Sequence, residues 1–224
     1  MESIKMSIRE RLEALRRELP AGVELVAVSK THPVEAIREA YNAGQRVFGE
    51  NRAQELRDKH DALPTDIAWH FIGSIQRKNV KYIAPYVAMI HSVDSAALLE
   101  QIDREAEKCG RRIDVLMEVF IARELSKHGW GEAELNAYFA SGAFQALTHV
   151  RIRGLMGMAT YTNDEVQIKQ EFCSLRERFD RYRNTVFATD EAFDTLSMGM
   201  TDDWPLAVTC GSTMVRVGSY IFGG

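Results

Sequence analysis

The sequence predicts a parallel (β/α)8 barrel with an extra helix before the first strand. Short β-rich runs alternate eight times with longer segments whose apolar residues recur every three or four positions. A chain of 224 residues can close such a barrel around one core, and no Gly-, Ser- or Pro-rich linker divides it. We therefore expect one domain over residues 1–224. An open doubly wound sheet is the alternative, although no G-x-G-x-x-G follows the first strand to support it.

The leading helix is expected to pack against the barrel and to take no part in chemistry, because its apolar residues form a single stripe that stops at Pro20. The stripe consists of Ile4, Ile8, Leu12, Leu15 and Leu19. Several later helical segments begin with Asp, Asn or Ser and end just before Gly, as helices often do. The eight predicted strands span residues 23–29, 46–49, 68–73, 88–93, 113–120, 150–158, 195–199 and 215–218.

Composition argues against nucleic acid and membranes as partners. The chain has 28 basic and 32 acidic residues, and its net charge of -4 offers no positive field that would hold a polyanion. No run approaches the roughly 20 apolar residues of a membrane span, and the charged N-terminal segment has no signal-peptide core. We expect a cytoplasmic protein whose partner is a small molecule or another protein.

The three cysteines suggest neither a disulfide framework nor a zinc site, because they are odd in number and far apart in the sequence. Cys109, Cys173 and Cys210 are expected to be buried thiols. The sequence therefore predicts no metal.

The first predicted strand leads into a lysine, which is an unusual residue after a buried run. The apolar residues 26–28 stand just before Lys30, and the active site of a barrel lies at the C-terminal ends of its strands. Burial would lower the pKa of the amine and leave it able to attack a carbonyl as a Schiff-base lysine. A solvated loop lysine is the alternative.

The last two strands end in small and hydroxyl-bearing residues. Gly218 lets the backbone approach an anion, in the part of a barrel that often binds phosphate. Hydroxyl donors are available from Ser197, Thr201 and Ser219. Arg216 alternates with Gly218 and so points to the same side of its strand, where a guanidinium needs a ring nitrogen, a phosphate or an acidic neighbour. Glycines that only serve turns, and a salt bridge at the arginine, are the alternatives.

An amine, a phosphate cradle and an arginine together suit pyridoxal 5'-phosphate (PLP). Six motifs support this cofactor: AVSKTHP, VFGENRAQE, WHFIGSIQRKN, HSVDS, GLMGMA and LSMGMTDDWPLAVTCGSTMVRVGSYIFG. In order and spacing they resemble the pyridoxal phosphate homeostasis protein family. The resemblance covers nearly the whole chain, and it implies a single-domain relative of the alanine racemase N-terminal barrel, of PLP fold-type III, which is often monomeric.

The resemblance also implies which residues contact the cofactor. Lys30 would carry PLP as a Schiff base, Arg216 would face the pyridine nitrogen, and the hydroxyls of the last two strands would bind the phosphate. The implied cofactor-binding residues are Lys30, Asn51, His70, Ser197, Thr201, Arg216, Gly218 and Ser219. At His70 a hydrogen-bonded core histidine is the alternative, and the same two interpretations apply to His91.

One further position matches the family, and two features of the sequence differ from it. Lys127 matches a family lysine near the pocket mouth, with a solvated loop lysine as the alternative. Relatives commonly carry a second lysine two residues after the Schiff-base lysine, where this chain has His32. The chain also stops at IFGG, where relatives often continue, so a terminal contact is expected to be missing.

The favoured function is a PLP carrier without efficient catalysis, which supplies the cofactor to apo-enzymes or returns it to the free pool. Arginine can only donate, so Arg216 would favour the unprotonated ring and weaken its electron sink. Only six residues follow Gly218, which leaves no C-terminal β domain to supply an opposing tyrosine, and Tyr161 and Tyr220 are the tyrosines near the rim. The alternatives are a small PLP-dependent amino-acid racemase or decarboxylase, and a phosphate-binding barrel without a covalent cofactor.

Overall fold

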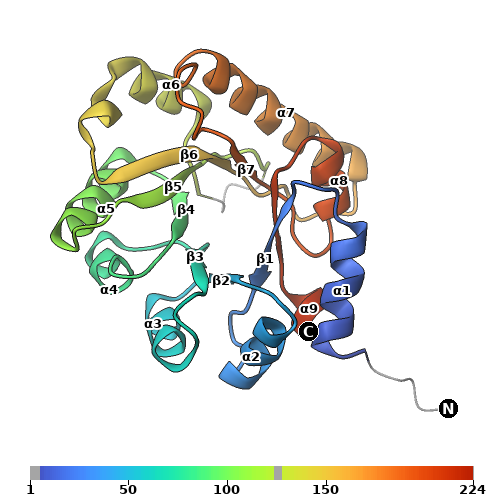
Figure 1. Ribbon diagram of the computed structural model, residues 1–224. Helices are drawn as coiled ribbons and strands as arrows, with labels where there is room; N and C mark the ends of the chain where they lie inside the picture. The colour runs from blue at the N-terminus through green and yellow to red at the C-terminus, as the bar shows by residue number, and fades with distance from the viewer. Residues whose placement is uncertain (1–5, 124–127, 224) are drawn as a thin grey trace.

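Eight parallel strands close into a barrel in the computed structural model, which describes residues 6–123 and 128–223 (Figure 1). Each strand pairs with the next, and β1 pairs with β8 to complete the ring. All eight predicted strands are present, so the (β/α)8 barrel is confirmed and the open doubly wound sheet is not formed. The strands are β1 (Glu24–Val28), β2 (Val47–Glu50), β3 (Ala68–Phe71), β4 (Met89–Val93), β5 (Ile113–Glu118), β6 (Val150–Met156), β7 (Thr195–Ser197) and β8 (Met214–Val217).

Helices surround the barrel and cover the outer faces of the strands (Figure 1). They are α1 (Ile8–Glu18), α2 (Val34–Asn42), α3 (Ala53–Ala62), α4 (Val80–Ile83), α5 (Ala96–Lys108), α6 (Glu132–Ser141), α7 (Glu165–Asn184), α8 (Trp204–Thr209) and α9 (Ser219–Phe222), with short 3-10 turns η1 (Arg77–Asn79) and η2 (Ala143–Ala146). Of the helices within the described ranges, none combines the length and the apolar composition that crossing a bilayer requires.

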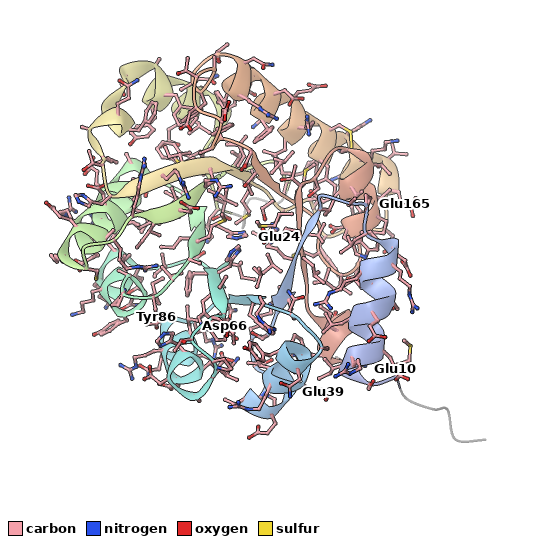
Figure 2. The ribbon with its side chains drawn as sticks, in the orientation of Figure 1. Glu10, Glu24, Glu39, Asp66, Tyr86 and Glu165 are labelled. Carbon is pink, nitrogen blue, oxygen red and sulfur yellow. A yellow bond between two sulfur atoms is a disulfide. The ribbon has the colours of Figure 1, made fainter. Side chains whose placement is uncertain are left out.

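The predicted leading helix is α1, which begins at Ile8 and ends before Pro20. Its apolar stripe is buried at Ile8 and at the next two described stripe positions, whereas Ile4 lies outside the described residues. Ser7 and Glu10 form a capping box, and Glu39 of α2 accepts a hydrogen bond of 3.1 Å from the Ile8 amide. Figure 2 labels Glu10 and Glu39 near the N-terminal end of α1. The helix is thus fixed beside α2 and α9, and none of its residues lines the pocket at the C-terminal end of the barrel.

The inside of the barrel holds an apolar cluster below its C-terminal end. Its buried members come from five strands and fill the interior with side chains. Arg216 lies two residues after the cluster member Met214 on β8, so strand alternation directs its side chain into the barrel above the cluster, as predicted. The cluster consists of Val26, Met89, Leu116, Met156 and Met214.

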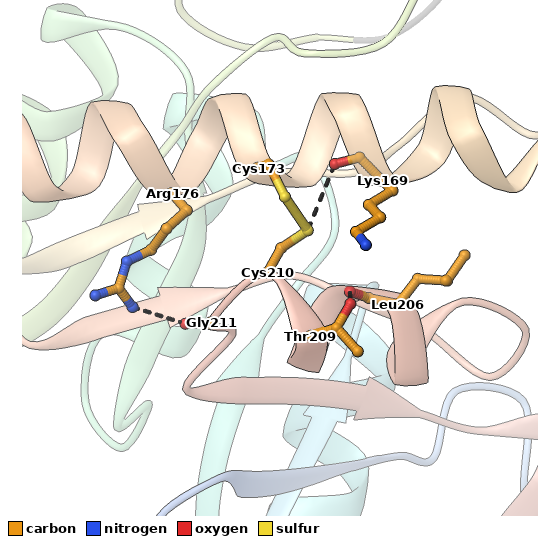
Figure 3. The surroundings of a disulfide bond; sticks show 7 residues. All are labelled: Lys169, Cys173, Arg176, Leu206, Thr209, Cys210 and Gly211. Carbon is orange, nitrogen blue, oxygen red and sulfur yellow. Dashed lines mark hydrogen bonds between the residues drawn. A yellow bond between two sulfur atoms is a disulfide. The ribbon is translucent and has the colours of Figure 1, made fainter.

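The prediction of three buried thiols is wrong. Cys173 of α7 and Cys210, just after α8, form a disulfide (Figure 3). Cys109 is a free thiol but is exposed. The two bonded residues are 37 positions apart, but α7 packs against α8 and brings their Cα atoms to 5.0 Å, a separation typical of disulfides. Sequence distance therefore gave no indication of their contact.

Replacing both Cys173 and Cys210 with serine is expected to lower the free energy of unfolding by about 2–4 kcal/mol under oxidising conditions, because the bond closes a loop of 37 residues. Guanidinium unfolding followed by circular dichroism measures this difference. The same comparison in dithiothreitol is the control, where most of the difference should disappear. Equal stability of the two proteins without reductant would contradict the expectation.

Candidate functional site

A pocket of about 520 Å³ opens at the C-terminal end of the barrel. Its walls come from the ends of β1, β2, β3, β5 and β8 and from the segments that follow β6 and β7. Parallel strands all end at the same rim, so residues distant in the sequence meet there. The predicted residues that line it are Lys30, Asn51, Thr201, Arg216, Gly218 and Ser219. The other two predicted residues, His70 and Ser197, are not part of its lining.

Lys30 lies in the turn after β1 and contributes to the wall of the pocket. The strand before it is buried from Leu25 to Val28, as predicted, but Lys30 itself is exposed. The expectation that burial would desolvate its amine is therefore wrong for this structure, since the chain turns outward directly after the strand. The amine is accessible to a molecule that enters from solvent.

Three polar groups meet on the β8 side of the pocket. The Gly218 amide donates to Thr201 Oγ1 at 3.3 Å, and Ser219 Oγ donates to the same oxygen at 3.1 Å. A side chain at Gly218 would place its Cβ 3.0 Å from the Val28 carbonyl oxygen, so the close approach of β8 to β1 favours glycine. Thr201 Oγ1 accepts from the other two groups, so its own hydroxyl hydrogen is left to donate to an anion, and the Gly218 amide and Ser219 hydroxyl can donate to an anion that replaces Thr201 Oγ1 as their acceptor.

Arg216 is buried, with 4% of its surface exposed, and reaches the pocket from β8. Its guanidinium donates to Ser197 Oγ at 2.5 Å and to the Gly157 carbonyl at 3.3 Å, and both acceptors are neutral. Burial lowers the pKa of Arg216 to about 10, although Asp203 and Glu118 act in the opposite direction. The arginine therefore stays protonated at neutral pH and can donate to a ligand.

Ser197 belongs to a hydrogen-bonded chain inside the barrel. It is fully buried, and His91 Nδ1 lies 3.1 Å from its hydroxyl, while His91 Nε2 lies 2.9 Å from His70 Nδ1. Burial lowers the pKa of His70 to about 4 and lowers that of His91 well below its ordinary value, so both rings are neutral. His70 and His91 thus have the surroundings of hydrogen-bonded core histidines. Ser197 accepts a hydrogen bond from Arg216 and so connects the guanidinium to this chain.

Asn51 follows β2 and is one of the residues that line the pocket. Among the buried side-chain oxygens of the described residues, its Oδ1 is one of the few without a hydrogen-bond partner. A buried acceptor without a partner costs free energy, which a donor on a bound molecule would recover.

Glu118 is a pocket residue that sequence reasoning missed. It ends β5, is 4% exposed and lines the same pocket as Lys30. Burial raises its pKa to about 7; nearby Asp94 adds to the effect and Arg216 opposes it. The signal was available in the sequence, because Glu118 alternates with Leu116 and is a charged residue at an inward position of an apolar strand.

The Glu118→Gln substitution is expected to flatten the pH dependence of stability. Because folding raises the pKa of Glu118 above its ordinary 4.5, the native state binds the proton more tightly, and stability falls as pH rises from about 4.5 to 7. At pH 8 the variant should be more stable than the wild type by about 2–3 kcal/mol, and at pH 4 nearly equal to it. Urea unfolding at both pH values tests this. Glu100→Gln, on the exposed face of α5, is the matched control, and equal slopes for Glu118→Gln and wild type would contradict the prediction.

Four other residues that the sequence suggested are not among the described residues that line the pocket. Lys127 falls outside the described residues. Tyr161 is 88% exposed and Tyr220 is 40% exposed, and neither lines the pocket. His32 stacks on Phe222 with ring centroids 4.8 Å apart, so it packs toward α9.

The chain is similar to one protein family, to curated proteins and to solved structures over most of its length. Residues 5–224 match the family "Alanine racemase, N-terminal domain". The pyridoxal phosphate homeostasis protein of Aquifex aeolicus is 38% identical over 201 residues, which cover 89% of this chain and 86% of the relative. The solved structure of PipY from Synechococcus elongatus without PLP is 41% identical, with a TM-score of 0.91, and covers 97% of this chain and 100% of PipY. PipY with PLP bound has the same identity and coverage and a TM-score of 0.88.

Proposed function

Because the chain belongs to the pyridoxal phosphate homeostasis protein family, whose fold is that of the alanine racemase N-terminal domain, we propose that it binds PLP and acts in PLP homeostasis. The observation that carries the proposal is the convergence of three groups on one pocket. These are the accessible amine of Lys30, the donors around Thr201 and the buried guanidinium of Arg216.

The pocket residues fit the chemistry of this cofactor. The Thr201 hydroxyl, the Gly218 amide and the Ser219 hydroxyl would hold the phosphate, which accepts hydrogen bonds. Asn51 Oδ1 lacks a donor, and PLP carries a ring hydroxyl that can provide one. Ser197, first expected at the phosphate, would instead act through Arg216.

Lys30 would be the attachment point. Bound PLP supplies an aldehyde that a lysine amine holds reversibly as a Schiff base, together with a ring that can withdraw electrons. Arg216 would donate to the ring nitrogen, and because it stays protonated it cannot accept a proton from the ring. The electron sink is then weak, which suits a carrier better than an efficient catalyst.

Reductive trapping tests the proposal. The purified protein is mixed with PLP, reduced with borohydride and digested, and we expect one phosphopyridoxyl group on the peptide that contains Lys30. Absorption near the wavelength of a PLP imine should appear before reduction. No adduct, or an adduct confined to another lysine, would overturn the assignment of Lys30.

A small PLP-dependent amino-acid racemase or decarboxylase is the second candidate, and Glu118 is the observation that favours it. A pocket carboxyl whose pKa is raised to about 7 can serve as an acid or a base at neutral pH. Incubation of the loaded protein with L-amino acids in heavy water distinguishes the two functions. Exchange or turnover on the order of 10 per second, lost in Glu118→Gln, would defeat the carrier proposal.

As a carrier, the protein would pass PLP to apo-forms of PLP-dependent enzymes. The accessible position of Lys30 supports release to solvent or to a partner. Transfer to an apo-enzyme across a dialysis membrane separates these routes, because only free PLP can cross it. Activation on the same side alone would indicate direct contact.

A further inference from the structure

We propose that the buried ammonium of Lys59 positions Lys30 by fixing the peptide groups on both sides of it. Lys59 is therefore a positioning residue and not a catalytic one. The inference rests on the proposed function, because it concerns the lysine that would hold PLP. Lys59 belongs to a network of side chains with Ser29, Glu50 and Glu55, and none of these four residues lines the pocket.

Lys59 of α3 is only 6% exposed, and its amine is surrounded by oxygen acceptors. Nζ donates to the Ser29 carbonyl at 2.7 Å, to Glu50 Oε1 at 2.6 Å and to Glu55 Oε1 at 2.7 Å. An ammonium has three N–H donors, and these three contacts use all of them. The ammonium thus joins the end of β1, the end of β2 and the first turns of α3.

The contacts fix the residue before Lys30. Ser29 is fully buried, its carbonyl accepts from Lys59, and its hydroxyl donates to Glu50 Oε1 at 2.6 Å. The peptide group between Ser29 and Lys30 is therefore held by the hydrogen bond from Lys59 to its carbonyl. The Ser29 side chain is held as well, because its hydroxyl donates to the Glu50 oxygen that also accepts from Lys59.

The residue after Lys30 is held by the same network. The Thr31 amide donates to Glu55 Oε1 at 2.6 Å, and this oxygen also accepts from Lys59. Thr31 has a φ of 66°, a left-handed conformation that is costly for a β-branched residue and persists only where the surroundings impose it. The Thr31 conformation reverses the chain at Lys30, so loss of its anchor would allow the lysine to change direction.

Electrostatics agree with this arrangement. Burial raises the pKa of Glu50, while the hydrogen bonds from Lys59 and Ser29 act to keep the carboxylate charged. At Glu55 burial also raises the pKa, but the donors Lys59 and Thr31 outweigh it and the net shift is downward. Removing the ammonium would leave Glu50 without its buried counter-charge, so a variant at Lys59 also affects folding.

The test compares Lys59→Met with Glu55→Ala, which removes the Thr31 anchor but leaves the contacts among Lys59, Glu50 and Ser29. Two quantities are measured for each protein: the fraction of Lys30 trapped by borohydride at a fixed PLP concentration, and the dissociation constant of pyridoxine 5'-phosphate, which has the phosphate and ring but no aldehyde. The matched control is Lys108→Met, an exposed helical lysine that also pairs with a glutamate.

We expect both variants to need at least tenfold more PLP for the same trapping, while their affinity for pyridoxine 5'-phosphate stays within about twofold of wild type. The control should match wild type in both measurements. Equal trapping in wild type and Glu55→Ala would overturn the inference, and so would a parallel loss of pyridoxine 5'-phosphate binding. If Lys59→Met does not fold, Glu55→Ala decides alone. Absence of trapping in wild type itself would reject the proposed function instead.

Discussion

Lys30→Ala is expected to lose the borohydride-trapped adduct completely and to bind PLP at least about tenfold more weakly, which corresponds to 1.4 kcal/mol or more. The reason is that, among the described residues that line the pocket, Lys30 alone carries an amine that can form a covalent bond with the aldehyde, whereas the groups around Thr201 form hydrogen bonds. Absorbance titration and mass spectrometry of the reduced protein measure both effects.

Lys78→Ala is a suitable control for this variant, because Lys78 is an exposed lysine in η1 and does not line the pocket. Its adduct and affinity should equal those of wild type. Binding of pyridoxine 5'-phosphate should be affected far less by Lys30→Ala than binding of PLP. An adduct that persists in Lys30→Ala would show that another amine holds the cofactor.

Arg216→Met is expected to weaken PLP binding by about 10- to 100-fold, the range for loss of a hydrogen bond from a charged donor. Stability of the free protein should nevertheless stay the same or rise by about 1–3 kcal/mol, because a buried guanidinium whose acceptors, Ser197 and Gly157, are neutral is replaced by an apolar chain. Calorimetric titration and urea unfolding give the two values. The absorption of the bound cofactor should also shift, since its ring nitrogen loses a donor.

Arg151→Met provides the matched control, because Arg151 forms a two-bond ion pair with Asp114 on the barrel and lies outside the pocket lining. This substitution should leave PLP binding unchanged. If Arg216→Met lowers the free energy of unfolding by more than about 2 kcal/mol, the buried guanidinium is holding the fold together and is not reserved for a ligand. Unchanged PLP affinity would equally contradict its assignment.

Strand order and the position of the rim could be predicted because they depend on local pattern. Short β-rich runs, separated by segments of helical period, specify eight repeats, and the parallel arrangement then places every strand end on one side. Arg216 and Gly218 were correctly assigned to the same face for this reason. The motif resemblance added Asn51, which alternation alone did not single out.

Burial and partner choice could not be predicted in the same way. Lys30 follows a buried strand but is exposed, because the chain makes a turn directly after the strand, in which the His32 amide donates to the Ser29 carbonyl and Thr31 is left-handed. Ser197 has the hydroxyl expected of a phosphate ligand, yet it lies one layer deeper, against Arg216 and His91. Side-chain depth within a barrel depends on the stagger of neighbouring strands, which no single segment encodes.

The sequence by itself determined the barrel, the end of it that carries the site and the chemistry of the residues found there. Tertiary structure decided which distant residues meet: Glu118 lines the pocket with Lys30, Lys59 contacts the peptide group before Lys30, and Cys173 bonds to Cys210. Periodicity and motif order are local properties of the chain, whereas these contacts arise only when segments far apart in sequence pack against one another. Their energies depend on the burial that this packing creates.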